Sequence, residues 1–324
     1  MDDTTGLIFG YVLDGKGGGT PVDWDGVEQW TPEKGTLWVH LDFTAEKVQQ
    51  WLETESNLSE ISRELLIEED TRPRFVSSKE GLFLILRVIN CNPGADPEDM
   101  VALRMCFDEN RIITMRQRRV VAIEDIHKAI ESDKGPIGPG DFLVMVNERI
   151  ADRMGDVVSE TDDQMDELED TVLTAESHTI RPMLANLRRQ CIGLRRYIAP
   201  QRDVLSRLLS ERVSWISDMD KLHLREIAER TARFVEDIDS ARDRAAITQE
   251  ELNNRLSEQM NKAMYVLSIV AAIFLPLGLL TGLLGINVGG IPGVENTLAF
   301  YNVSMFLLLL ALVLVWNFKR IKWI

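Results

Sequence analysis

The sequence AMYVLSIVAAIFLPLGLLTGLLGINVGGIPGV, residues 263–294, contains no Asp, Glu, Lys, Arg or His. A second run without these residue types, NTLAFYNVSMFLLLLALVLVWNF, occupies residues 296–318. Because about 20 apolar residues in a helix span the hydrocarbon core of a bilayer, the two runs predict a transmembrane hairpin. One hairpin cannot enclose a water-filled path, so we expect several copies of the chain to assemble around a shared axis.

Basic residues flank this hairpin on one side only. Arg255 and Lys262 precede the first run, and Lys319, Arg320 and Lys322 follow the second, whereas the connecting loop has no basic residue. Lys and Arg are enriched in the cytoplasmic segments next to membrane spans. The sequence therefore predicts that both termini lie in the cytoplasm.

The remainder of the chain is acidic. The 324 residues include 36 Lys and Arg against 52 Asp and Glu, and the formal net charge is −16. Such a chain is a poor match for nucleic acid, whose phosphates require a basic surface. The acidity fits attraction of cations, and it fits equally the solubility of a large cytoplasmic domain.

Residues 1–140 are predicted to form a cytoplasmic α/β domain. Segments rich in β-branched and aromatic residues predict strands at residues 7–14, 36–43, 74–78, 82–90, 101–107 and 111–115. Helical spacing predicts helices at residues 45–56, 59–70 and 120–132. Residues 79–81 and 108–110 have the composition of hairpin turns.

Residues 141–262 are predicted to form a helical and stalk region. The sequence GPIGPG at 135–140 is a break, and Asp141 is the expected N-cap of the helix that follows. The last stalk helix is predicted to begin near Asp218 and to run unbroken to Leu284. It would be about 100 Å long and would need packing partners along its length.

A heptad stripe along this helix is the face that would contact those partners. The stripe consists of Leu224, Thr231, Ile238, Ala245, Leu252, Gln259 and Val266, with Ile227, Phe234, Ala241 and Thr248 interleaved. Many of its members are small or polar, so we expect a looser seam than in a two-stranded zipper. A broad bundle of parallel stalks accounts for this pattern, and packing against a helix of the same subunit accounts for part of it.

Residues 263–324 form the predicted transmembrane hairpin with its loop and basic tail. One face of the first span is small or polar in comparison with the bulky remainder, and its residues recur every three or four positions. We predict that this face lines a pore, although close helix packing explains Gly278 and Gly282 equally well. The face consists of Asn261, Met264, Leu267, Ala271, Leu275, Gly278 and Gly282.

Neither span contains Asp, Glu, Lys, Arg, His or Cys. Proton relays within membranes usually depend on such groups, and zinc sites usually depend on Cys or His. A cation would therefore pass mostly hydrated, in contact with amide and carbonyl oxygens. The chain also shows no nucleophile and base pair or metal triad at useful spacing, so we do not expect an enzyme.

The tripeptide Gly285-Ile286-Asn287 closes the first span, and a short loop, a final span and a basic tail with Trp follow. In these features the chain resembles the CorA superfamily of divalent cation transporters. Most of that family has Met at the middle of the tripeptide. Ile286 and the Gly-Gly-Ile-Pro-Gly run at residues 289–293 are instead similar to the ZntB branch, which is associated with zinc.

The resemblance implies a fold, an assembly and a set of site residues. The fold is an α/β cytoplasmic domain, long stalk helices and two C-terminal transmembrane helices in a funnel-shaped homopentamer. Gly285, Ile286 and Asn287 would form the selectivity motif at the outer mouth, although Gly and Asn also suit a helix C-cap. Asn261, Met264 and Leu267 would line the inner pore and its hydrophobic constriction.

Other positions are less firmly implied. Leu275 and Gly278 stand where CorA proteins often have Met and Thr, which predicts a wider and less polar middle of the pore. Glu295, the single charge of the outer loop, either raises the local cation concentration or is simply solvated. The candidates for cytoplasmic metal binding between subunits are Glu226, Glu236, Asp237 and Glu250.

The function implied by the resemblance is zinc uptake across the bacterial inner membrane, coupled to the proton gradient. The expected partners are further copies of the chain, the lipid bilayer and the transported divalent cation, with no cofactor and no nucleic acid. Two alternatives remain open. One is a channel for magnesium, cobalt or nickel, and the other is a membrane-anchored, metal-responsive scaffold without transport.

Overall fold

The computed structural model describes residues 5–68, 72–172, 177–286, 291, 293 and 296–320. The chain divides into two compact units, Met1–Gln249 and Glu250–Ile324. The predicted boundaries at residues 140 and 262 mark changes in sequence character and stay predictions.

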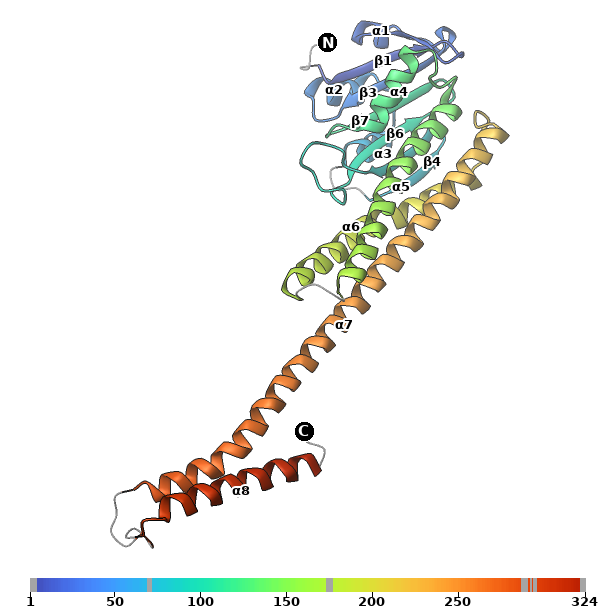
Figure 1. The fold of residues 1–324 in the computed structure, drawn as a ribbon. Helices are drawn as coiled ribbons and strands as arrows, with labels where there is room; N and C mark the ends of the chain where they lie inside the picture. Colours follow the sequence, from blue (N-terminus) through green and yellow to red (C-terminus); the bar gives the residue numbers. More distant parts are fainter. Residues whose placement is uncertain are drawn as a thin grey trace. The chain divides into compact units, whose positions relative to one another are not determined.

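The first unit begins with a seven-stranded mixed sheet (Figure 1). Its strands are β1 (Leu7–Leu13), β2 (Gly19–Pro21), β3 (Thr36–Asp42), β4 (Arg74–Ser78), β5 (Gly81–Val88), β6 (Val101–Phe107) and β7 (Arg111–Arg116). The spatial order is β2-β1-β3-β7-β6-β5-β4. Only β3 and β7 pair in parallel among these strands, and the other five pairs are antiparallel.

Helices cover both faces of the sheet. The helices of this part are α1 (Trp24–Glu28), η1 (Pro32–Lys34), α2 (Glu46–Thr54), α3 (Glu60–Ile67) and α4 (Val121–Glu131). Side chains such as Val39 and Cys106 pack with Trp24 and Trp51 in a buried core on one face. On the opposite face, Trp38 lies 5.1 Å from the ring of Phe142 in the long helix that follows.

The six predicted strands and three predicted helices of the α/β domain are confirmed. Both predicted hairpin turns are present, between β4 and β5 and between β6 and β7. At the first turn Gly81 has a φ of 143°, a conformation that favours glycine. The last two residues of the helix predicted for residues 59–70, at positions 69 and 70, lie outside the described residues.

Four long helices complete the chain: α5 (Pro139–Val172), α6 (Ser177–Ser210), α7 (Asp218–Leu284) and α8 (Ala299–Arg320). The prediction that Asp141 caps α5 is wrong, because the helix begins two residues earlier, at Pro139. Proline suits the first helical position, where no N–H donor is needed. Asp141 lies within the first turn, and its carboxylate accepts a hydrogen bond from the backbone N–H of Ile137.

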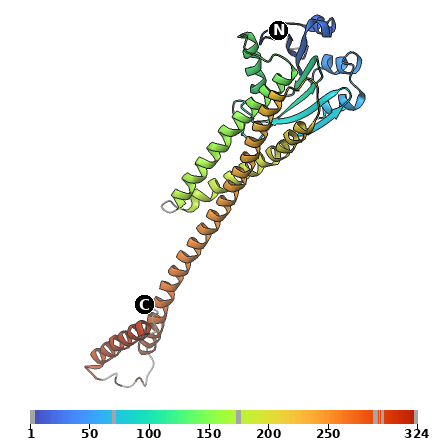
Figure 2. The ribbon, with the colours of Figure 1, turned by 90° about the vertical axis from the view of Figure 1, so that its right-hand side faces the viewer.

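The prediction for α7 is confirmed at both ends, Asp218 and Leu284. Figures 1 and 2 show α5, α6 and the first half of α7 side by side in the first unit. Ion pairs join them: Arg195 of α6 contacts Asp239 of α7 at 2.6 Å, and Arg230 of α7 contacts Asp152 of α5 at 2.9 Å.

Most of the heptad stripe of α7 is buried against other elements of the same subunit. Its members in the first unit are buried, except for half-buried Phe234: Leu224, Ile227, Thr231, Ile238, Ala241, Ala245 and Thr248. Thr231 satisfies its hydroxyl by donating to the carbonyl of Ile227 at 2.8 Å. A bundle of stalks from several subunits is therefore not needed to explain this part of the stripe. Gln259 and Val266, farther along, are exposed in the single chain.

The loop at residues 89–100, between β5 and β6, is anchored on α6. A Cβ atom added at Gly193 of α6 would lie only 2.7 Å from the Cβ of Glu98 in this loop. Replacing a helical glycine by alanine normally stabilises a protein by about 0.5–1 kcal/mol. Here the overlap, which costs about 1–3 kcal/mol in a packed site, reverses the sign.

We therefore expect Gly193→Ala to lower the free energy of unfolding by about 1 kcal/mol, measured by urea titration of the full chain. Gly155→Ala in α5 is the matched control, since its added carbon would meet only the ring tip of Phe234 at 3.3 Å. Equal effects of the two substitutions would contradict the close contact between the loop and α6.

Candidate ion pathway

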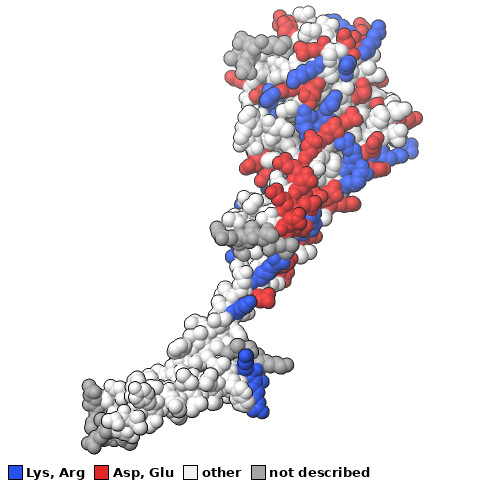
Figure 3. All heavy atoms as spheres, in the orientation of Figure 1, with Lys and Arg blue, Asp and Glu red and all other residues white. Residues whose placement is uncertain are grey.

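Two described helices, α7 and α8, are long and apolar enough to cross a membrane. In the view of Figure 3 the second unit is largely uncharged, with basic side chains at the C-terminal end of α8, where Lys319 and Arg320 form the last turn. Arg320 also lies 5.4 Å from the ring centroid of Trp316. This end of the hairpin has the basic and aromatic residues typical of a membrane–water boundary.

One face of α7 packs toward α8. Its half-buried residues are Ile269, Ala272, Ile273, Pro276, Leu277 and Leu280, and the half-buried residues of α8 are Val303, Leu307, Leu310, Ala311, Leu314 and Phe318. Each set recurs every three or four positions, as expected for two helices in contact along a seam. The bulky residues of the first span therefore serve partly to join the hairpin.

The face predicted to line a pore lies on the other side of α7. Residues two positions apart on a helix are separated by about 200°, so Leu275 lies opposite Ile273 and Leu277. Leu275 is 72% exposed and Leu267 69% exposed in the single chain. Asn261, Met264, Ala271, Gly278 and Gly282 are exposed as well. The seven residues thus share one face that α8 leaves open.

Two hydroxyl groups of this span, those of Ser268 and Thr281, bond to their own helix. Ser268 donates to the carbonyl of Met264 at 2.8 Å, and Thr281 donates to the carbonyl of Leu277 at 3.0 Å. Their oxygen lone pairs remain able to accept. The polar groups along this segment are therefore uncharged hydroxyl and carbonyl groups, since it contains no Asp, Glu, Lys, Arg or His.

The helix α7 ends at the predicted tripeptide. The backbone N–H of Gly285 donates to the carbonyl of Thr281 at 2.9 Å, and Ile286 is exposed. The φ of Gly285 is not positive, so this residue does not act as a left-handed helix cap. Carbonyl groups at a helix C-terminus carry partial negative charge, which favours nearby cations. Asn287 and Glu295 lie outside the described residues.

The cytoplasmic metal candidates do not meet within one chain. Glu226, Glu236, Asp237 and Glu250 are exposed on α7. Among the described residues there is no group of three or more His, Cys, Asp and Glu side chains that could hold a metal ion. The pKa of Asp237 is raised, first by the partial loss of solvent around its carboxylate and then by the negative charges of Asp162 and Glu236.

The sequence did not predict that an arginine of α7 forms ion pairs with the acidic end of α5. Arg244 of α7 pairs with Asp162 at 2.8 Å, with Glu169 at 2.6 Å and with Asp166. The carboxylates of Glu169 and Asp166 hold the pKa of Arg244 above its ordinary value. The contacts join residues about 80 positions apart, so only the tertiary structure reveals them.

Comparison with known proteins extends these observations. The model of a family described as CorA-like Mg2+ transporter protein matches residues 33–320. The chain is 39% identical over 326 residues to the divalent cation transporter CmaX of Pseudomonas aeruginosa, covering 99% of this chain and 98% of that protein. It is 37% identical over 317 residues to the zinc transport protein ZntB of Yersinia pestis, covering 98% and 96%.

Solved structures give the same fold. The full-length CmaX structure matches with a TM-score of 0.86 at 38% identity, over 99% of both chains. The CorA magnesium transporter of Methanocaldococcus jannaschii matches with a TM-score of 0.82 over 98% and 99%, at 18% identity. This last likeness concerns the fold alone. It confirms the predicted architecture of an α/β domain, long helices and two apolar C-terminal helices.

Proposed function

Because the chain belongs to the CorA family of divalent metal cation transporters, we propose that it carries zinc inward across the bacterial inner membrane, coupled to the proton gradient. Membership of this family also makes the chain a membrane transporter and not an enzyme. Zinc is supported by the similarity to the ZntB protein. It is supported further by Ile286 and the glycine-rich run after it, which resemble the ZntB branch.

The pathway we propose is a pore on the axis of a homopentamer. The observation that carries it is the open face of α7, which bears Leu267, Leu275 and Gly278 and lies opposite the seam with α8. In a membrane such a face meets either lipid or further copies of the chain. Gly278 and Gly282 allow helices to approach closely, which favours further copies.

The outer mouth of this pore would be the tripeptide Gly285, Ile286 and Asn287. A ring of neutral amide oxygens from Asn287 can orient the water around a dication without removing it. The carbonyl end of α7 adds partial negative charge at the same place. Glu295 would raise the cation concentration outside the mouth. Glu226, Glu236, Asp237 and Glu250 could bind a metal only together with groups from a neighbouring subunit.

The alternative function is a channel for magnesium, cobalt or nickel. It is favoured by the span itself, since residues 263–294 offer no carboxylate or imidazole to accept a proton. A scaffold without transport is less well supported, because an anchor needs neither the open face of α7 nor the tripeptide.

Uptake into vesicles containing the purified full-length protein tests these alternatives. We expect zinc to enter faster than magnesium, and an inward pH step of one unit, worth about 1.4 kcal/mol per proton, to increase zinc accumulation up to about tenfold. A protonophore should abolish the increase. Empty vesicles and external EDTA are the controls.

Other outcomes would contradict parts of the proposal. Faster magnesium uptake that ignores the pH step would favour the channel. An assembly of about five chains in detergent that moves none of these cations would favour the scaffold, and a monomer would exclude the shared pore.

A further inference from the structure

A cavity of about 220 Å³ lies at the edge of the sheet where β5 ends, β6 begins and β7 has just ended. Among the described residues that line it, the charged ones are Arg87, Arg104, Arg118 and Asp99. Tyr197 of α6 lies on a further side. Three arginines and one aspartate thus line one small cavity, in a chain whose net charge is −16.

Two of the guanidinium groups are held in place by neighbouring groups. Arg87 donates to the carbonyl of Met100 at 2.9 Å, and its guanidinium lies 4.7 Å from the ring centroid of Tyr197. Arg104 is only 2% exposed and lies 4.2 Å from the ring centroid of Phe43. Fixed, planar guanidinium groups are suited to oxyanions, which they bind through paired hydrogen bonds.

The third guanidinium group, that of Arg118, sits at the cavity entrance. Its Nη1 lies 2.6 Å from Oδ2 of Asp99, and the two side chains are 58% and 61% exposed. Exposed ion pairs of this kind contribute at most about 1 kcal/mol, so this pair can open readily. Arg118 and Asp99 also border a neighbouring hollow of about 420 Å³, lined in addition by Asn90, Asn92 and Arg119.

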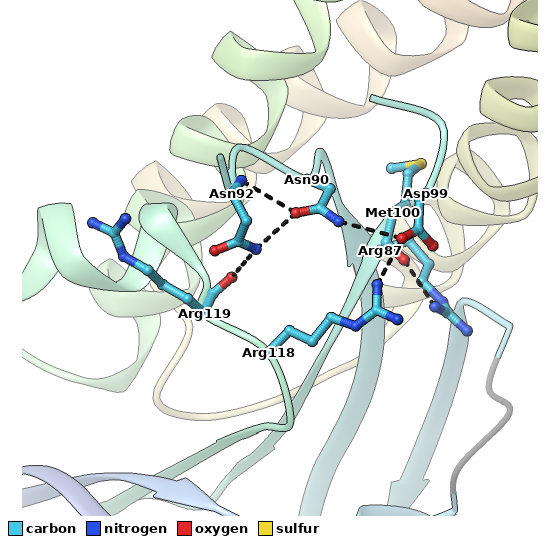
Figure 4. Close-up of polar contacts among 7 residues, drawn as sticks. All are labelled: Arg87, Asn90, Asn92, Asp99, Met100, Arg118 and Arg119. Carbon is cyan, nitrogen blue, oxygen red and sulfur yellow. Dashed lines mark hydrogen bonds and ion pairs between the residues drawn. The ribbon is translucent and has the colours of Figure 1, made fainter. Parts of the chain in front are cut away.

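The loop around Asp99 is ordered by its own amide groups. Asn90 accepts from the backbone N–H of Asn92 at 3.2 Å and from its side-chain amide at 2.7 Å, and Nδ2 of Asn90 lies 3.5 Å from the Asp99 carboxylate (Figure 4). Figure 4 shows Arg118 reaching toward Asp99 and Arg87, whereas the guanidinium of Arg119 points away from them. The carboxylate of Asp99 therefore occupies the place that an incoming oxyanion would take at Arg118.

We propose that this cavity binds a small phosphate-bearing anion, which replaces the Asp99 carboxylate at Arg118 and also contacts Arg87. A phosphate group carries a charge of about −1.5 to −2 at neutral pH, which matches the guanidinium groups of Arg118 and Arg87 better than a monocarboxylate does. The site is distinct from the ion pathway, and its occupation does not depend on which cation the protein carries.

Isothermal titration calorimetry on the full-length protein in detergent, at constant ionic strength, tests this site. The probes are inorganic phosphate, pyrophosphate and AMP, which separate a free phosphate ion from a phosphate group on a larger molecule. We expect saturable binding of at least one probe with a Kd below about 1 mM. Arg118→Gln should weaken it at least about tenfold, because charge-assisted hydrogen bonds are lost.

Two further variants make the test specific. Asp99→Asn removes the competing carboxylate and should tighten binding by at least about threefold. Arg119→Gln is the matched control, since it removes the same charge from the next residue, whose guanidinium is paired with Glu124. It should leave the Kd unchanged. All three positions are exposed or half-buried, and thermal unfolding of each variant verifies that it folds.

The proposal is overturned if none of the probes binds saturably to the wild-type chain. Equal losses in Arg118→Gln and Arg119→Gln would also overturn it, because they would indicate diffuse attraction to surface charge. Weaker binding in Asp99→Asn would show that Asp99 does not compete with the anion, and would overturn it as well.

Discussion

Replacing Leu275 by lysine is expected to lower metal uptake at least about a hundredfold, whereas Leu275→Met should leave it nearly unchanged. Leu275 is 72% exposed on the face of α7 opposite α8. If that face lines a pentameric pore, the substitution places five ammonium groups around one axis. At about 8 Å, each repels a divalent cation by about 1 kcal/mol even at the dielectric constant of water. The summed barrier of several kcal/mol corresponds to a rate loss well beyond hundredfold.

The methionine variant separates charge from size at the same position. Its side chain is long and apolar, so it should disturb the helix no more than lysine does. Uptake into vesicles is measured for both variants after sizing in detergent shows equal assembly. Wild-type flux through assembled Leu275→Lys protein would mean that this face of α7 does not border the path of the ion.

Acidification below pH 6.5 is expected to destabilise the α/β domain through His40. The imidazole is 1% exposed, lies 2.8 Å from the hydroxyl of Thr114 and stacks on Phe9. Burial, followed by the positive charge of Arg116, lowers the pKa of His40 from 6.5 to about 3. Between these two pH values the unfolded chain takes up a proton at His40 that the folded chain does not. Stability is therefore complete above pH 6.5 and falls as the pH decreases through this window.

The expected loss is about 1.4 kcal/mol per pH unit, or about 2 kcal/mol between pH 6.5 and pH 5. Urea titrations followed by tryptophan fluorescence at several pH values measure it. His40→Phe should remove this slope, while His127→Phe should retain it, because it leaves the buried His40 in place. A slope that persists in His40→Phe would assign the acid sensitivity to other groups.

Much of the fold could be predicted from local sequence. Strand β5 begins with the apolar run Leu82–Leu86 after a turn, and α7 keeps one periodic stripe from Leu224 to Thr248. The glycine-rich strand β2 was missed because its three residues have no strand pattern of their own and pair only with β1. The start of α5 was missed because a capping carboxylate and a residue of the first turn look alike in sequence.

The candidate sites differ in how far sequence could locate them. The open face of α7 follows from helix geometry alone, so spacing was enough to group Leu267, Ala271 and Leu275. What that face meets depends on other copies of the chain, about which one sequence says little. The arginine-lined cavity could not be foreseen, because it requires the register that pairs Arg87 with Ala102 and Ile85 with Arg104.

If the open face of α7 lines the pore, the hydroxyl groups of Ser268 and Thr281, each donating to a carbonyl one turn earlier, are poor relays for a proton. With no carboxylate or imidazole in the span to relay it, a proton that accompanies the metal would have to move along the chain of water molecules in the pore. Coupling would then depend on an unbroken column of solvent. Any stimulus that dries the narrowest part of the path would stop proton and metal together.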